Sequence, residues 1–99
     1  MQRRTVSPFN LQTPMGTFNR LGVEGTANLY CSYNPDTYDQ DVAELSNAIR
    51  TYVREANYLD THREYNDTTV RHQTLIDRAA AVIERLTSCA AHVVCHNLL

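Results

Sequence analysis

Apolar residues recur at every third or fourth position along two stretches in the second half of the chain. The first series is Val42, Leu45, Ile49, Tyr52, Ala56 and Leu59, and the second is Ile76, Ala79, Ile83, Leu86, Ala90 and Val93. This spacing places a single apolar stripe along an amphipathic helix. No proline or glycine follows Pro35, and Asn34-Pro35-Asp36 has the residue types that begin a helix. The pattern therefore predicts a mostly α-helical body over residues 35–99.

The two apolar series do not share one heptad phase, and the window between them is polar. In a single long helix the apolar stripe would have to change to another face of the helix at this point. In a hairpin each helix has its own stripe, and no such change is needed. Residues 66–69 also offer groups that can stop one helix and cap the next. We therefore expect an antiparallel αα-hairpin with helices at roughly 37–64 and 69–96. One long helix remains the alternative, because no glycine marks the turn.

Residues 1–34 have a different character from the body. All three glycines lie there, with two of the three prolines, and the apolar residues are mostly isolated. We expect an extended, irregular N-terminal arm, in which the alternation over 27–33 allows a short strand. The natural anchors for such an arm on a neighbour are Phe9, Leu11, Phe18 and Leu29.

Two helices that meet along one stripe leave most of their flanks in water, so they need a third layer. That layer is either the arm, a second copy or a larger partner. The sequence thus predicts a structural or interaction protein that docks on or cements a larger assembly, with a virion capsid as one example. The predicted docking residues are Phe9, Leu11, Phe18, Leu29, Leu45, Ile49, Tyr52, Arg54, Tyr58, His62, Tyr65, Ile83 and Leu86.

Tyr58, His62 and Tyr65 in that set share one helix face, rotated away from the apolar seam and joined by Arg54. Tyrosine and arginine are enriched among the residues that dominate binding energies. A solvated helix face would show the same pattern, so the sequence leaves both interpretations open.

Cys89, His92 and His96 are the residues most suggestive of chemistry. On a continuous helix, positions i, i+3 and i+7 share one face and could present ligands to zinc or copper. The fourth ligand of a closed zinc site is missing, and such spacings arise easily by chance. We therefore expect no metal or other cofactor, and keep a small metal-binding or thiol-redox module as the alternative function.

Composition excludes several other classes. The formal net charge of −2 gives no broad basic footprint, which makes nucleic acid an unfavourable main partner. All nine Lys and Arg positions are arginine. We attribute this to a bias in the coding sequence rather than to a surface that makes bidentate contacts, which is the alternative. No apolar stretch suits a signal peptide or a membrane span, so we expect an intracellular protein, soluble or within a large assembly. No motif of an enzyme or of a small-molecule substrate site occurs, and we expect no enzymatic activity.

Overall fold

The computed structural model describes the backbone of residues 14–99 and the side chains of residues 22–99. Its elements are α1 (Pro14–Tyr30), α2 (Tyr38–Thr61), α3 (Asp67–Thr87), α4 (Ala91–Cys95) and the 3-10 turn η1 (His96–Leu98). The prediction of a mostly helical chain whose helices pack against each other is confirmed. The described residues include no strand, so the strand allowed at 27–33 is wrong.

Helix α1 occupies residues that we expected to be irregular. Gly22 interrupts it with φ 63° and ψ −165°, a backbone conformation that is essentially restricted to glycine. The hydroxyl of Thr26 donates to the Gly22 carbonyl at 2.7 Å, which satisfies an acceptor next to the kink. Beyond the kink, Ala27 is fully buried while Leu29 is 56% exposed, as on opposite faces of a helix. The alternation in this segment therefore does not have the period of a strand.

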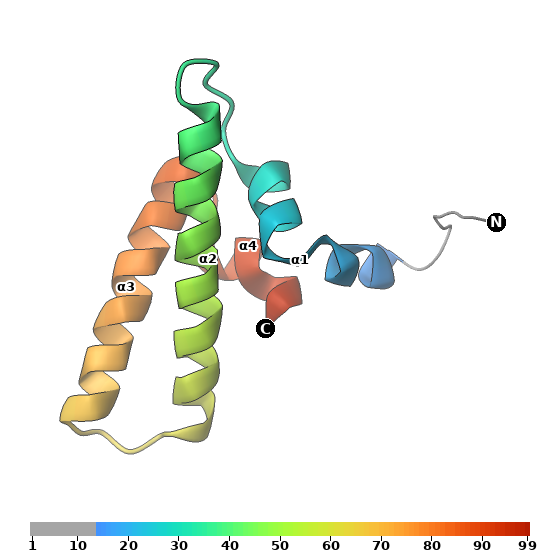
Figure 1. Ribbon diagram of the computed structural model, residues 1–99. Coiled ribbons are helices and arrows are strands. Elements are labelled where there is room, and N and C mark those ends of the chain that lie inside the picture. Colours follow the sequence, from blue (N-terminus) through green and yellow to red (C-terminus); the bar gives the residue numbers. More distant parts are fainter. Residues whose placement is uncertain (1–13) are drawn as a thin grey trace.

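Helices α2 and α3 lie against each other and run in opposite directions, with residues 62–66 between them (Figure 1). Asn66 caps α3: its side-chain oxygen accepts the amide of Thr69 at 3.0 Å, and the Thr69 hydroxyl accepts the Asn66 amide at 3.0 Å. This reciprocal pair satisfies two amide groups at the helix start. Because the chain breaks between Thr61 and Asp67, one continuous helix does not describe it.

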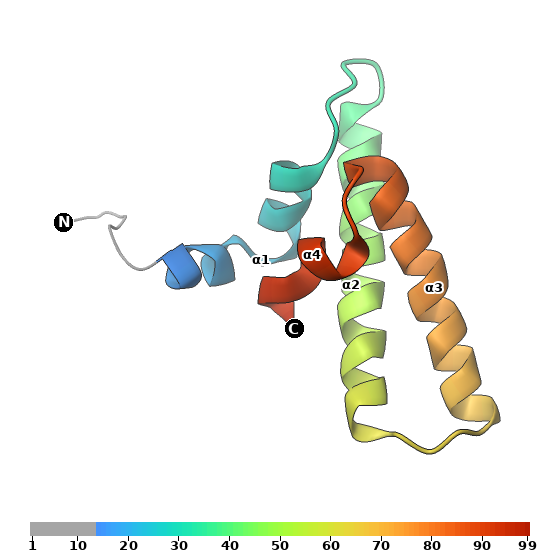
Figure 2. The ribbon, with the colours of Figure 1, turned by 180° about the vertical axis from the view of Figure 1, so that it is seen from behind.

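Helix α3 ends earlier than its apolar spacing predicts. It stops at Thr87, and Ser88 follows in the left-handed conformation with φ 59°. The Thr87 hydroxyl accepts the amide of Cys89 at 3.0 Å, which holds the turn into α4. The predicted helix over 69–96 is thus two helices, and the short α4 folds back instead of extending α3 (Figure 2).

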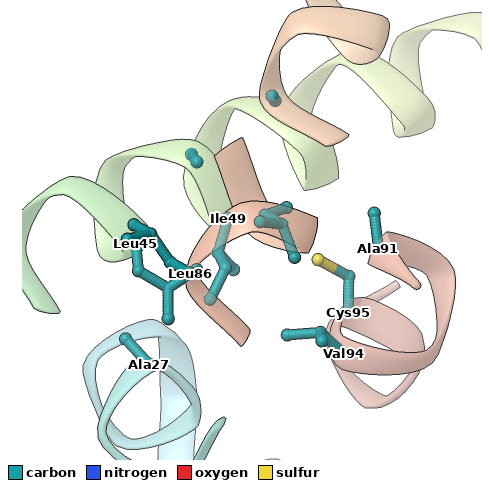
Figure 3. Close-up of a cluster of buried hydrophobic side chains, with 10 residues drawn as sticks. Ala27, Leu45, Ile49, Leu86, Ala91, Val94 and Cys95 are labelled. Atoms are coloured by element: carbon teal, nitrogen blue, oxygen red, sulfur yellow. The ribbon is translucent and has the colours of Figure 1, made fainter. Parts of the chain in front are cut away.

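The core lies where four helices meet, and Figure 3 shows its closely packed side chains. Its members are Ala27, Leu45, Ala48, Ile49, Ala79, Ile83, Leu86, Ala91, Val94 and Cys95. Residues of α1 and α4 therefore cover the α2 and α3 pair and complete the core that two helices alone lack. The amide of Ser32 donates to the Leu86 carbonyl at 2.8 Å and ties the end of α1 to the end of α3.

The fold is flat, with principal extents of 51 × 36 × 16 Å. Helices pack about 8–10 Å apart, so the shortest extent corresponds to two helix layers. Helix α4 lies behind α2 in Figure 1 and in front of it in Figure 2, so it covers one face of the α2 and α3 pair. None of the described helices is both long and apolar enough to cross a bilayer.

Candidate partner-binding face

The structure divides the predicted docking residues into four groups. Phe9 and Leu11 lie outside the described residues, as does the side chain of Phe18. Of the others, Leu29, Arg54, His62 and Tyr65 are exposed, and Tyr52 and Tyr58 are half-buried.

The remaining four docking predictions need correction. Leu45, Ile49 and Ile83 are 0% exposed, and Leu86 is 7% exposed. They are covered by α1 and α4 of their own chain, so they form its core and present no surface to a partner. The sequence does not reveal this burial, because the segment that forms α1 has the pattern of an irregular arm.

The three candidate metal ligands do not share a helix. Cys89 is half-buried in the turn before α4, whereas His92 lies in α4 and His96 at the start of η1, both exposed. Within the described part of the chain, no three His, Cys, Asp or Glu side chains gather as a metal site requires. Burial raises the pKa of the Cys95 thiol to about 11, and burial, followed by the charge of Asp41, raises that of Cys31. Both thiols are therefore weak nucleophiles at neutral pH.

A buried carboxylate lies between α2 and α3, toward the 62–66 loop. Glu55 is 5% exposed, and it accepts hydrogen bonds from Nδ1 of His72 on α3 and from Nε of Arg54, the latter at 2.8 Å. The bond from His72, and after it that from Arg54, holds the pKa of Glu55 below its ordinary value despite burial. The carboxylate is thus charged and satisfied, which favours a structural role in joining the two helices.

Three aromatic rings stack beside this carboxylate. The centroid of the Tyr58 ring lies 3.9 Å from that of His62, with the planes at 4°, and 3.8 Å from that of His72, with the planes at 25°. Two rings at these distances must lie on opposite faces of the tyrosine. Tyr58 therefore separates the two imidazoles and prevents them from sharing one ion. Tyr65, which we expected on the same stripe, instead lies in the loop and is 91% exposed.

A shallow apolar groove of about 290 Å³ runs between α2 and α3. Ala48 and Ala79 are its small, buried residues, and Leu75 and Val82 are its larger apolar ones. Its lining residues are Glu44, Asn47, Ala48, Thr51, Leu75, Arg78, Ala79 and Val82, all from α2 and α3. We call the surface formed by these eight residues the open face, because neither α1 nor α4 contributes to it.

Arginines border the open face along α3. Arg71, Arg78 and Arg85 recur at every seventh residue, so they share one side of the helix, and all three are exposed. Arg85 reaches across to α2 and pairs with Glu44. Arg71 and Arg78 form no ion pair with the side chains that the structure describes. The seven-residue spacing of these arginines is present in the sequence, but the spacing alone does not show that they lie beside an apolar groove.

Comparison with known proteins adds no relative to this picture: no family model, curated protein or solved structure matches the chain.

Proposed function

We propose that this chain is a non-enzymatic interaction protein, an αα-hairpin subunit that docks on a larger protein assembly through the open face. The observation that carries the proposal is the apolar groove between α2 and α3 with its border of arginines. Apolar side chains rimmed by charged ones are typical of surfaces that bind other proteins. A subunit of a virion capsid is one form that this role could take, by analogy alone.

The predicted N-terminal anchors extend this proposal. Phe9, Leu11 and Phe18 would add a second contact to the same assembly, joined to the first by the chain itself. Two linked contacts bind more tightly than either alone, because the second forms at high effective concentration. This part of the proposal depends on residues whose side chains the structure does not describe.

The alternative, a metal-binding or thiol-redox module, has weaker support. It requires Cys89, His92 and His96 to converge, and the turn at residues 88–90 separates the first from the other two. Metal analysis of the purified chain tests this alternative directly, since it predicts stoichiometric zinc or copper.

The docking proposal is tested by position-specific photo-crosslinking. A photoreactive amino acid at Leu75 or Thr51 should crosslink the chain to one discrete protein in cells that produce it naturally. The matched control position is Ala81, which is exposed on α3 but is not part of the open face. Equal labelling at all three positions, or no discrete product at any of them, would refute docking through this face.

Light scattering and circular dichroism on the purified chain complete the test. The core of the single chain is covered by its own α1 and α4, so we expect a helical monomer. A poorly helical or aggregating chain would instead indicate that the body folds only on its partner.

A further inference from the structure

We infer that the open face binds an acidic amphipathic helix, with apolar side chains in the groove and carboxylates on the arginines of α3. The inference rests on the proposed function and identifies the chemistry of the partner. Three observations carry it: the shape of the groove, the spacing of the arginines and the imbalance of charge around them.

The groove suits a helix because α2 and α3 lie side by side and form its two edges. Its lining runs from Glu44 to Thr51 on α2 and from Leu75 to Val82 on α3, which is about two turns of each helix, or about 10 Å at about 1.5 Å per residue. Ala48 and Ala79 form its lowest part, where a large side chain of a third helix can enter. A partner helix that lies along such a groove contacts it with residues at positions i, i+3, i+4 and i+7.

The arginine spacing matches the same partner. Residues seven apart on α3 are separated by about 10.5 Å along the helix axis. An acidic residue at every seventh position of a partner helix would meet Arg71, Arg78 and Arg85 in turn. Guanidinium groups bind carboxylates through two parallel hydrogen bonds, which gives such pairs a defined geometry.

Charge decides between this partner and a second copy of the chain. The open face and its arginine border contain one exposed carboxylate, Glu44, and Arg85 already pairs with it. Arg71 and Arg78 have no carboxylate partner among the described side chains. Two copies packed through this face would bring these positive charges together, which costs binding energy.

Nucleic acid fits the face less well than a helix does. A phosphate backbone would engage the arginines but leave Leu75 and Val82 without a contact. Single strands bind through exposed aromatic rings, and the open face includes none. The chain also has a net charge of −2, so it lacks the excess of basic residues that phosphate binding requires.

The test measures binding of a fluorescent model peptide by anisotropy. The peptide is a helix of about 20 residues with leucines at helical spacing and glutamates at every seventh position. Its control has lysine in place of each glutamate. We expect the acidic peptide to bind, more weakly at high salt, and the basic one to bind at least about tenfold more weakly.

Variants locate the binding site. Arg78→Glu should weaken binding of the acidic peptide by about tenfold or more, and Leu75→Asp by a similar factor. Arg63→Glu is the matched control: Arg63 is exposed, pairs only with Asp60 and lies outside the open face, so binding should change less than about twofold. Circular dichroism verifies that each variant is folded, and Arg78→Gln replaces Arg78→Glu if the latter is not.

Four outcomes would overturn the inference. They are equal binding of both peptides, no effect of Arg78→Glu or Arg78→Gln, tighter binding of an oligothymidine strand, and a dimer that Leu75→Asp dissociates. If neither peptide binds while Leu75 still crosslinks to a discrete protein, docking stands and the acidic helix is wrong. If crosslinking fails as well, the proposed function is also wrong.

Discussion

The Glu55–His72 pair should be coupled strongly enough to measure in a double-mutant cycle. His72→Ala removes one of the two hydrogen bonds to a carboxylate that is 5% exposed. Leaving a buried charge without its partner costs about 3–5 kcal/mol. Two features reduce that figure here: Arg54 stays bound at 2.8 Å, and the His72 side chain is 27% exposed. We therefore expect a coupling free energy of about 1.5–3 kcal/mol between positions 55 and 72.

The cycle consists of the unmodified chain, Glu55→Gln, His72→Ala and the double variant. The free energy of unfolding of each comes from urea titration followed by circular dichroism at neutral pH. His72→Ala also removes the stack on Tyr58, but this loss occurs in both backgrounds and cancels in the coupling. The exposed pair of Asp60 and Arg63, at 75% and 79% exposure, serves as the control and should couple by less than about 0.5 kcal/mol. Additivity within about 0.5 kcal/mol at positions 55 and 72 would refute the reasoning.

The same pair predicts how stability depends on pH. The folded pKa of Glu55 is lowered, so its contribution is present above the unfolded value of about 4.3 and is lost as pH falls through the folded value. The difference in unfolding free energy between the unmodified chain and Glu55→Gln should therefore shrink as the pH falls below about 4. A difference that grows on acidification would contradict the assigned direction.

Three further substitutions test the backbone and the helix caps. Gly22→Ala should lower the free energy of unfolding by about 1–3 kcal/mol. The cause is backbone strain alone, because a Cβ at this position meets no atom within 4 Å. An unchanged urea midpoint would contradict the kink. Ser88→Gly should raise the melting temperature, by up to about 4–8 °C, because glycine removes about 1 kcal/mol of left-handed strain. A lower melting temperature would show that the Ser88 side chain stabilises the turn. Asn66→Ala should cost about 1 kcal/mol in urea unfolding through the lost cap on the Thr69 amide, and Asn66→Asp should retain most of it.

Local chemistry made some helix boundaries predictable. The sequence places the start of the first long helix at residue 37, and α2 begins at Tyr38. Residues 66–69 were expected to cap a helix, and Asn66 does so with its own side chain. The Asn66 cap can be recognised in the sequence because it depends on atoms only a few residues apart. At the start of α2, Thr37 makes no side-chain cap bond.

Tertiary contacts determined the parts that the sequence did not reveal. Residues 23–31 were read as a polar arm, yet Val23, Ala27 and Cys31 follow helical spacing and pack against the core. The break at Ser88 has neither glycine nor proline to mark it. It forms because α4 can then bury Val94 and Cys95 against the other helices, which more than offsets the strain of one residue.

The candidate site was predicted only in part, for a related reason. Tyr58 and His62 were named correctly as neighbours, but the partner that completes the stack is His72, which is distant in sequence. Glu55 could have been noticed, because it lies three residues after Tyr52 and four before Leu59, close to the apolar stripe. A single charged residue on such a stripe needs a buried partner, and only the fold identifies it.

The buried pair also explains how the open face keeps its geometry. Figure 1 shows α1 and α4 beside the part of the α2 and α3 pair that is remote from the 62–66 loop. None of the residues that the structure describes covers these two helices near the loop, so an apolar seam there would remain partly in water and would tolerate sliding of one helix on the other. The hydrogen bond between Glu55 and His72 tolerates no such slip, because a shift of one turn would leave the carboxylate buried with Arg54 alone. The pair thus fixes the register that sets Ala48 beside Ala79 and Glu44 beside Arg85, which is the register on which the groove and its arginine border depend.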